Sequence, residues 1–290
     1  MTFYLLALGS MLAYAVQHTL LVHHARKMDG LSLAFYRNIS FVVTLLPLLL
    51  GADEQNLKIL FAHWPLLLGA AFSGGAYLAI VFAGFRYLNV SFANTISVSV
   101  YTLATVALGW ILLGEHMPFI GTILIAVILV GVLYFGIQQE GVVKKNKDLW
   151  FGIFLAALCG IPLAYTKYAV AALSRLSNPF VSGYFWELGI GLAAGILLLL
   201  RFIFTKKRIE KISGKHFLQI AACSSPTLIG TGLYCMAVER GPIAIVGAIG
   251  AGSLVACTLL AHAWYGERIT NKQWLAIGLI IIGVAGLKFV

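Results

Sequence analysis

Long apolar runs separated by short polar connectors dominate the pattern of this sequence. Most runs approach the ~20 residues that cross a ~30 Å hydrocarbon layer as a helix. The runs predict ten transmembrane helices near 3–23, 32–51, 64–87, 92–113, 118–138, 149–173, 179–204, 216–237, 243–265 and 272–289. The connectors leave no room for a domain outside the membrane, so we expect an all-α integral membrane protein whose functional site lies between helices.

Composition supports this fold class, because 61% of the 290 residues are hydrophobic and only 10% are charged. A soluble domain carries about a quarter charged residues. The net charge of +10 resides in short connectors rather than in a basic arm, which argues against nucleic-acid binding. The four cysteines lie in apolar runs without metal-ligand spacing, so we expect no metal and no cofactor.

The chain repeats itself at an offset of 152 residues. Gly114-Glu115 recurs as Gly266-Glu267, and the same offset pairs Gly131 with Gly283. The ten spans therefore divide into two five-helix repeats. The predicted boundaries are 1–138 for the first repeat, 139–148 for a polar linker and 149–290 for the second repeat.

Five is an odd number, so the second repeat must enter the membrane from the opposite side. Equivalent connectors should then differ in charge. The connector between spans two and three contains Asp53, Glu54 and Lys58, whereas its counterpart between spans seven and eight contains Lys206, Lys207, Arg208, Lys211 and Lys215. The pattern predicts two inverted repeats, 5+5, around a central cavity.

The basic residues also predict an orientation. One face collects Arg26, Lys27, Arg86, Lys144, Lys145, Lys147, Arg201, Lys206, Lys207, Arg208, Lys211, Lys215, Arg268 and Lys272. The other face has Lys58, Arg175, Arg240 and Lys288. The positive-inside rule makes the first face cytoplasmic and places both ends of the chain outside a plasma (inner) membrane.

These features resemble a known family. The stretch Leu33-Ala34-Phe35-Tyr36-Arg37 at the start of span two, the repeated Gly-Glu turn and the ten short-looped spans are similar to EamA-type members of the drug/metabolite transporter superfamily. The resemblance implies a secondary transporter, commonly an exporter of amino acids or other small metabolites, without a nucleotide-hydrolysing part. It also implies that both termini are cytoplasmic, against the charge count.

Three charged side chains stand out because they lie away from the ends of predicted spans: Arg37, Lys167 and Glu187. Lys167 near the end of span six and Glu187 near the start of span seven both fall ~9–12 Å below the same membrane face, so they can meet. The pair either orients two helices or forms a gate or coupling site that opens during transport, unless Lys167 reaches the membrane surface. Arg37 either attracts an anionic substrate group or binds helix ends and headgroups.

Polar residues at helical spacing extend this candidate site. They are Tyr14, Gln17 and His18 in span one, Asn94, Ser97 and Tyr101 in span four, and Tyr165 and Trp186, which lie beside the two charges along the chain. Hydroxyls and amides at such positions either join helices or contact substrate. Glu187 is a better candidate proton carrier than His18. The alternative role of His18 is to fill space between helices while its ring is hydrogen-bonded. We expect Glu115 and Glu267 to cap the helices that follow them.

The favoured function is a secondary active transporter or exporter of an amino acid or a related zwitterionic or anionic metabolite, by alternating access and with proton coupling as an option. A membrane receptor or assembly subunit and a membrane enzyme are the alternatives. The sequence contains no His-Glu-x-x-His motif and no serine elbow, which disfavours an enzyme. The expected partners are a small-molecule substrate and membrane lipid, and both a monomer and a dimer are compatible with this reading.

Overall fold

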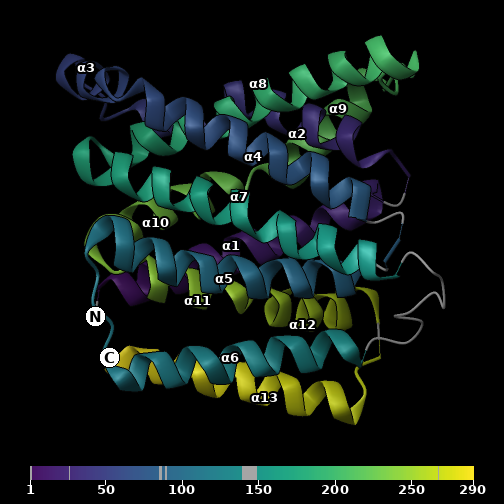
Figure 1. Ribbon diagram of the computed structural model, residues 1–290. Helices are drawn as coiled ribbons and strands as arrows, with labels where there is room; N and C mark the ends of the chain where they lie inside the picture. The colour runs from purple at the N-terminus through teal and green to yellow at the C-terminus, as the bar shows by residue number, and fades with distance from the viewer. Residues whose placement is uncertain (1, 26, 85–86, 89, 139–148, 267) are drawn as a thin grey trace.

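A computed structural model describes residues 2–25, 27–84, 87–88, 90–138, 149–266 and 268–290. These residues form helices that run lengthwise through one bundle (Figure 1). The elements are α1 (Thr2–Ala25), α2 (Gly30–Thr44), η1 (Leu46–Leu49), α3 (Glu54–Ala62), α4 (Trp64–Gly84), α5 (Val90–Leu113), α6 (Phe119–Ile137), α7 (Leu149–Leu176), α8 (Pro179–Thr205), α9 (Gly214–Ser224), α10 (Thr227–Arg240), α11 (Ile243–Ala251), α12 (Ser253–Tyr265), α13 (Asn271–Gly286) and η2 (Leu287–Phe289). The all-α fold class is confirmed for the described part of the chain.

Eight helical stretches within these ranges are long and apolar enough to cross a membrane, or nine if the bent pair α3 and α4 counts as one span. The predicted second span is shorter than expected, because α2 has 15 residues and then tightens into the 3₁₀ turn η1. Two other predicted spans are broken, at Ser225-Pro226 between α9 and α10 and at Gly252 between α11 and α12. The count of ten crossings therefore stays a prediction.

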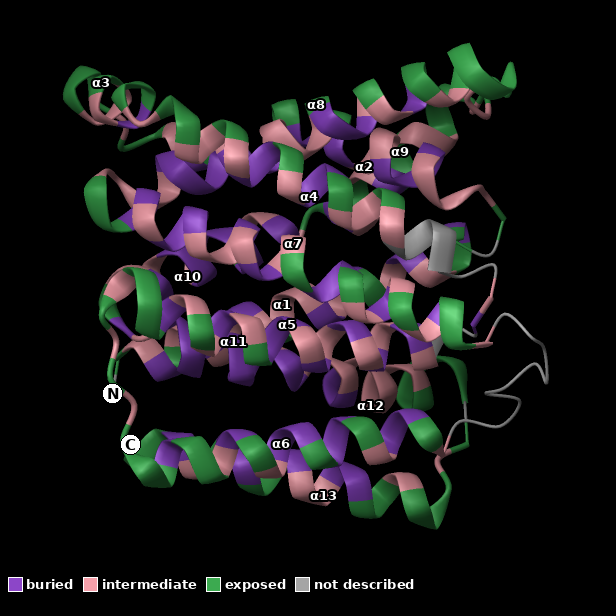
Figure 2. Ribbon diagram, viewed as in Figure 1, coloured by how far each residue is buried: buried purple, intermediate pink, exposed green. Residues whose placement is uncertain are grey.

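The surface of the bundle is apolar. Exposed residues lie along the outer faces of the helices, and buried residues concentrate where helices face one another (Figure 2). Large side chains such as Leu50, Phe119 and Phe204 are 79–88% exposed. A water-soluble monomer rarely exposes so much apolar area, so this surface fits contact with lipid.

Local sequence explains where several helices begin. Asp29 accepts a hydrogen bond from the backbone N–H of Ser32 at the start of α2, and Asn178 caps α8, whose first residue is a proline. Thr270 and Gln273 form a capping box at the start of α13. Such caps satisfy the first backbone N–H groups of a helix, which have no partner within it.

Both chain ends lie at one end of the bundle (Figure 1). The basic connector between α8 and α9 lies at the opposite end of the bundle (Figure 1), which we call the basic end. The predicted basic positions Arg26, Arg86, Lys144, Lys145 and Lys147, the linker 139–148 and Glu267 lie outside the described residues.

The pair α6 and α13 displays the internal symmetry most directly. A β-carbon built at Gly131 would lie 2.7 Å from Ile280 Cγ1, and one built at Gly283 would lie 2.5 Å from Ile128 Cγ1. The two contacts are reciprocal, because the 152-residue offset converts one pair into the other. Such reciprocal contacts are typical of two copies related by a two-fold axis.

The close approach of these helices generates a prediction. Gly283→Ala should lower the free energy of unfolding by about 1–3 kcal/mol, because its methyl group would overlap Ile128 and the Leu124 carbonyl. Gly278→Ala on the same helix is the matched control, since its β-carbon would meet nothing within 4 Å. The thermal unfolding midpoint of the detergent-purified protein measures both variants. Equal midpoints would contradict close packing at Gly283.

Candidate functional site

Lys167 on α7 points its ammonium group at three aromatic rings from three other helices. Its Nζ lies 4.0 Å from the ring centre of Tyr234 on α10, 4.4 Å from that of Trp186 on α8 and 5.7 Å from that of Tyr14 on α1. We call Tyr14, Trp186 and Tyr234 the aromatic cage. The negative faces of aromatic rings attract a cation, so the cage offsets part of the penalty for placing Lys167 inside the bundle.

Glu187 follows Trp186 on α8 and is 3% exposed. Its Oε1 accepts hydrogen bonds from Thr231 Oγ1 at 3.0 Å and from the Tyr14 hydroxyl at 3.4 Å. The Tyr14 hydroxyl is also 2.7 Å from Thr231 Oγ1. Hydroxyl donors thus solvate the carboxylate in place of water.

The predicted meeting of Lys167 and Glu187 occurs through Tyr14 rather than through a direct ion pair. Tyr14 presents its ring to the ammonium and its hydroxyl to the carboxylate. No ion pair joins the two charges in the part of the chain that the structure describes. The physical reason is that neutral groups already stabilise each charge. Aromatic rings surround the Lys167 ammonium, and hydroxyl groups donate hydrogen bonds to the Glu187 carboxylate.

Arg37 on α2 is the second cation of this region. Its guanidinium lies over the Phe41 ring, 5.0 Å from the ring centre, and its buried Nε has no hydrogen-bond partner. None of the ion pairs among the described residues involves Arg37. Its charge and that of Lys167 both act on His18, whose side chain is exposed. Arg37 and His18 therefore mark an accessible side of the cluster.

Other predicted site residues lie in packing contacts. The Tyr165 ring contacts Gly69 of α4, and the backbone of α5 at Ser97 and Tyr101 packs against Gly160 of α7. The Tyr101 hydroxyl lies against Gly247 of α11.

Two further predicted residues carry side-chain amides. Asn94 is partly buried on α5. Gln17 is fully buried on α1, and neither amide atom has a hydrogen-bond partner. The structure thus brings Tyr14, Lys167, Trp186 and Glu187 together directly.

Sequence reasoning did not assign Thr231 and Tyr234 to the site. Both lie on α10, three residues apart, and therefore on one helix face. The spacing of a hydroxyl and an aromatic residue shortly after Pro226 was the available signal. It is a weak signal, because aromatic residues are frequent throughout this chain.

At the end of the bundle that holds the termini, Glu115 joins the two halves. Its carboxylate pairs with Arg175 of α7 and accepts a hydrogen bond from Ile243 N at the start of α11. The expectation that Glu115 caps the helix after it, α6, is therefore wrong. Gly114 has a left-handed backbone (φ 65°) and redirects the chain so that Glu115 caps a helix of the other half instead.

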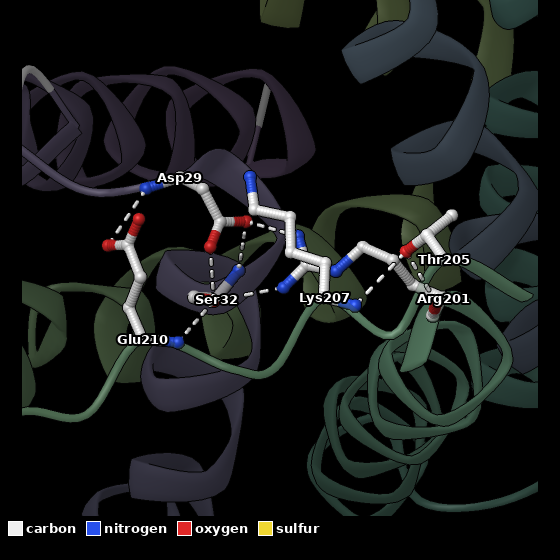
Figure 3. Close-up of polar contacts among 6 residues, drawn as sticks. All are labelled: Asp29, Ser32, Arg201, Thr205, Lys207 and Glu210. Atoms are coloured by element: carbon white, nitrogen blue, oxygen red, sulfur yellow. Dashed lines mark hydrogen bonds and ion pairs between the residues drawn. The ribbon is translucent and has the colours of Figure 1, made fainter. Parts of the chain in front are cut away.

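At the basic end, Asp29 joins the halves (Figure 3). Its carboxylate pairs with Arg201 of α8 at 2.7 Å and bonds Ser32, while its backbone N–H donates to Glu210 at 3.2 Å. Burial raises the pKa of the Asp29 carboxyl, but the hydrogen bonds from Arg201 and Ser32 outweigh burial and hold that pKa below its usual value.

A cavity of about 440 Å³ opens near the termini between α5, α6 and α11. It is lined mainly by apolar side chains, with Glu115 and His116 among the polar ones. Within the described ranges, no three His, Cys, Asp or Glu side chains gather closely enough to hold a metal ion.

The fold and the buried charged cluster define a multi-pass α-helical membrane protein. The model of the EamA-like transporter family matches residues 1–137 and again residues 150–289. The chain belongs to this family, whose members are membrane transporters rather than enzymes. The double match agrees with the internal repeat.

Solved structures show the same fold. One crystal structure, described only as that of a protein, superposes with a TM-score of 0.75 over 97% of this chain and 96% of that chain. Sequence identity is 16%, so this likeness concerns the fold alone. No curated protein matches the sequence.

The pKa of Asp29 yields a pH prediction. A lowered carboxyl pKa adds stability that is complete above the unfolded value of about 3.9 and is lost as the pH falls through the folded value below it. Asp29→Asn should therefore lower the unfolding midpoint equally between about pH 5 and 8, and the difference should shrink as the pH falls below about 3.9 and vanish below the lower pKa of the folded protein. Since Asn also caps helices, the substitution isolates the ion pair.

Asp53→Asn is the matched control for Asp29→Asn. Asp53 caps α3 in the same way, and none of the described ion pairs includes it. It should change the midpoint little at any pH. Identical behaviour of the two variants would show that the Arg201 contact adds nothing.

Proposed function

We propose that this protein is a secondary active transporter of a small zwitterionic metabolite, such as an amino acid, and that it works by alternating access between its two halves. Membership of a family of small-solute transporters supports the general class. The substrate class and the mechanism rest on the charges at the centre of the bundle and on the contacts between halves.

The observation that carries the proposal is the set of charges inside spanning helices that have no opposite charge bound to them. Lys167, Arg37 and Glu187 take no part in the ion pairs found in the described ranges. Each ionised side chain near the membrane centre costs roughly 2.5–3.5 kcal/mol on insertion scales. A bound zwitterion could offset this cost for all three side chains. Its ammonium group would stabilise Glu187, and its carboxylate would stabilise Lys167 and Arg37.

Ion pairs at both ends support alternating access. Glu115–Arg175 joins the halves near the termini, and Asp29–Arg201 joins them at the basic end. Opening either end requires its own pair to separate while the other holds. In this proposal the two pairs are therefore the alternating gates.

Glu187 is the proposed site of proton coupling. It is a buried carboxylate whose hydroxyl partners can donate to the ionised form and can accept from the protonated form. A proton on Glu187 would weaken its attraction for the substrate's ammonium group and favour release. We further propose a plasma-membrane location with the basic end facing the cytoplasm, as the charge distribution favours.

Transport by the purified protein in liposomes tests the proposal. A panel of labelled amino acids and other zwitterions should include at least one that enters, faster when a pH difference is imposed. Glu187→Gln should remove the response to the pH difference. Glu239→Gln, near the end of α10 and about one-third exposed, should keep it.

The flux measurement also has a clear negative outcome. If properly inserted protein moves no zwitterion, with or without a pH difference, the proposed function is wrong. If flux occurs and Glu187→Gln responds to pH like the wild type, proton coupling through Glu187 is excluded.

A further inference from the structure

The surroundings of Lys167 are those of a recognition site for an ammonium group. Rings that converge on one cation from several sides are a recurrent way to bind quaternary and other methylated ammonium ligands. Here Tyr14, Trp186 and Tyr234 come from three different helices and surround a cation that belongs to a fourth. A packing role for Lys167 would not require three rings.

Ring faces are the direct contacts of the Lys167 ammonium, and the charge of Glu187 attracts it from farther away. No hydrogen bond or ion pair to its Nζ occurs among the described residues, although an ammonium group carries three N–H donors. Its four-carbon stem is flexible. Lys167 can therefore leave the cage without breaking a hydrogen bond to the protein.

Two buried nitrogen atoms near the cage also have no hydrogen-bond partner among the described residues. Trp186 is 3% exposed, and its Nε1–H is buried without a hydrogen-bond acceptor. Such an orphaned donor carries a penalty of about 1–3 kcal/mol, which a bound acceptor would remove. The buried Nε of Arg37 is orphaned in the same way. The two unsatisfied donors and the Lys167 ammonium are three groups that could bind a carboxylate.

We propose that the aromatic cage is the ammonium subsite of a zwitterionic substrate and that Lys167 is its tethered occupant when no substrate is bound. The substrate's ammonium group takes the place of the Lys167 Nζ beside Glu187. The displaced Lys167, together with Arg37, then binds the substrate's carboxylate. This inference rests on the proposed function and specifies its substrate class.

The exchange conserves charge. The Lys167 ammonium leaves the cage and the ammonium group of the substrate enters. The carboxylate of the substrate then pairs with the displaced Lys167. Ring faces hold methylated ammonium groups better than primary ones, because a primary ammonium must give up strong hydration without gaining an acceptor. The preferred substrates are therefore N-methylated amino acids and betaines.

A binding comparison on the wild-type protein tests the subsite. The probes are glycine betaine and 3,3-dimethylbutyrate, which have the same shape and carboxylate but differ in the positive charge. Titration calorimetry in detergent should show roughly tenfold tighter binding of glycine betaine. Equal affinities, or binding of the uncharged isostere alone, would overturn the inference.

Chemical rescue tests the same subsite without a substrate. Lys167→Ala empties the cage, so tetramethylammonium should raise the unfolding midpoint of this variant and leave the wild type unchanged. The rescue should disappear in Lys167→Ala/Tyr234→Leu. Lys288→Ala is the matched control, because Lys288 lies over the single exposed ring of Phe289. Absence of rescue in a folded Lys167→Ala protein, or equal rescue in the double variant, would refute the cage as a subsite.

The outcomes separate this inference from the proposed function. Liposome flux of zwitterions without cage binding would leave a transporter whose substrate binds elsewhere. Cage binding without any flux would leave an ammonium-binding protein that does not transport. Should Lys167→Ala not fold, the betaine comparison on the wild type decides alone.

Discussion

A charge inside a hydrocarbon layer must be solvated by the protein, and this constraint shapes the centre of the bundle. Lys167 is solvated by three rings, Glu187 by two hydroxyls and Arg37 by one ring. These partners are neutral, so none removes the charge as an ion pair would. The centre therefore holds charges that no ion pair among the described residues neutralises, which is the property that the proposed zwitterion site needs.

The same helices that carry the central charges also carry the contacts at the two ends. Lys167 and Arg175 are both on α7, and Glu187 and Arg201 are both on α8. At 1.5 Å per residue, these pairs are ~12 Å and ~21 Å apart along their helices. If binding at the centre moved α7 or α8, it would also move Arg175 or Arg201 and so disturb an ion pair that joins the halves. These two helices therefore connect the proposed binding site with the proposed gates.

Much of this arrangement could be predicted from sequence, because apolar run length and charge placement directly reflect the membrane. The depths of Lys167 and Glu187 predicted that the two side chains could meet, and in the structure both contact Tyr14. Their partners could not be predicted, since a hydroxyl or a ring becomes a partner only through packing between distant segments, as with Thr231 and Tyr234. The packing of the Tyr165 ring against Gly69 of α4 could not be predicted either, and a role for Tyr165 in the site stays a prediction. Glu115 caps α11 rather than α6 because the path of the chain after Gly114 decides which helix end it meets.

Nuclear magnetic resonance of lysine side chains tests the account most directly. In protein labelled with ¹³C at the lysine ε position, ring currents from the aromatic cage should shift the Lys167 ε-protons upfield, and Lys167→Arg would identify the signal. Saturating glycine betaine should return this signal toward the ordinary lysine position while the other lysine signals stay unchanged. A Lys167 signal that remains shifted in the presence of a transported zwitterion would contradict the exchange of cations at the centre of the bundle.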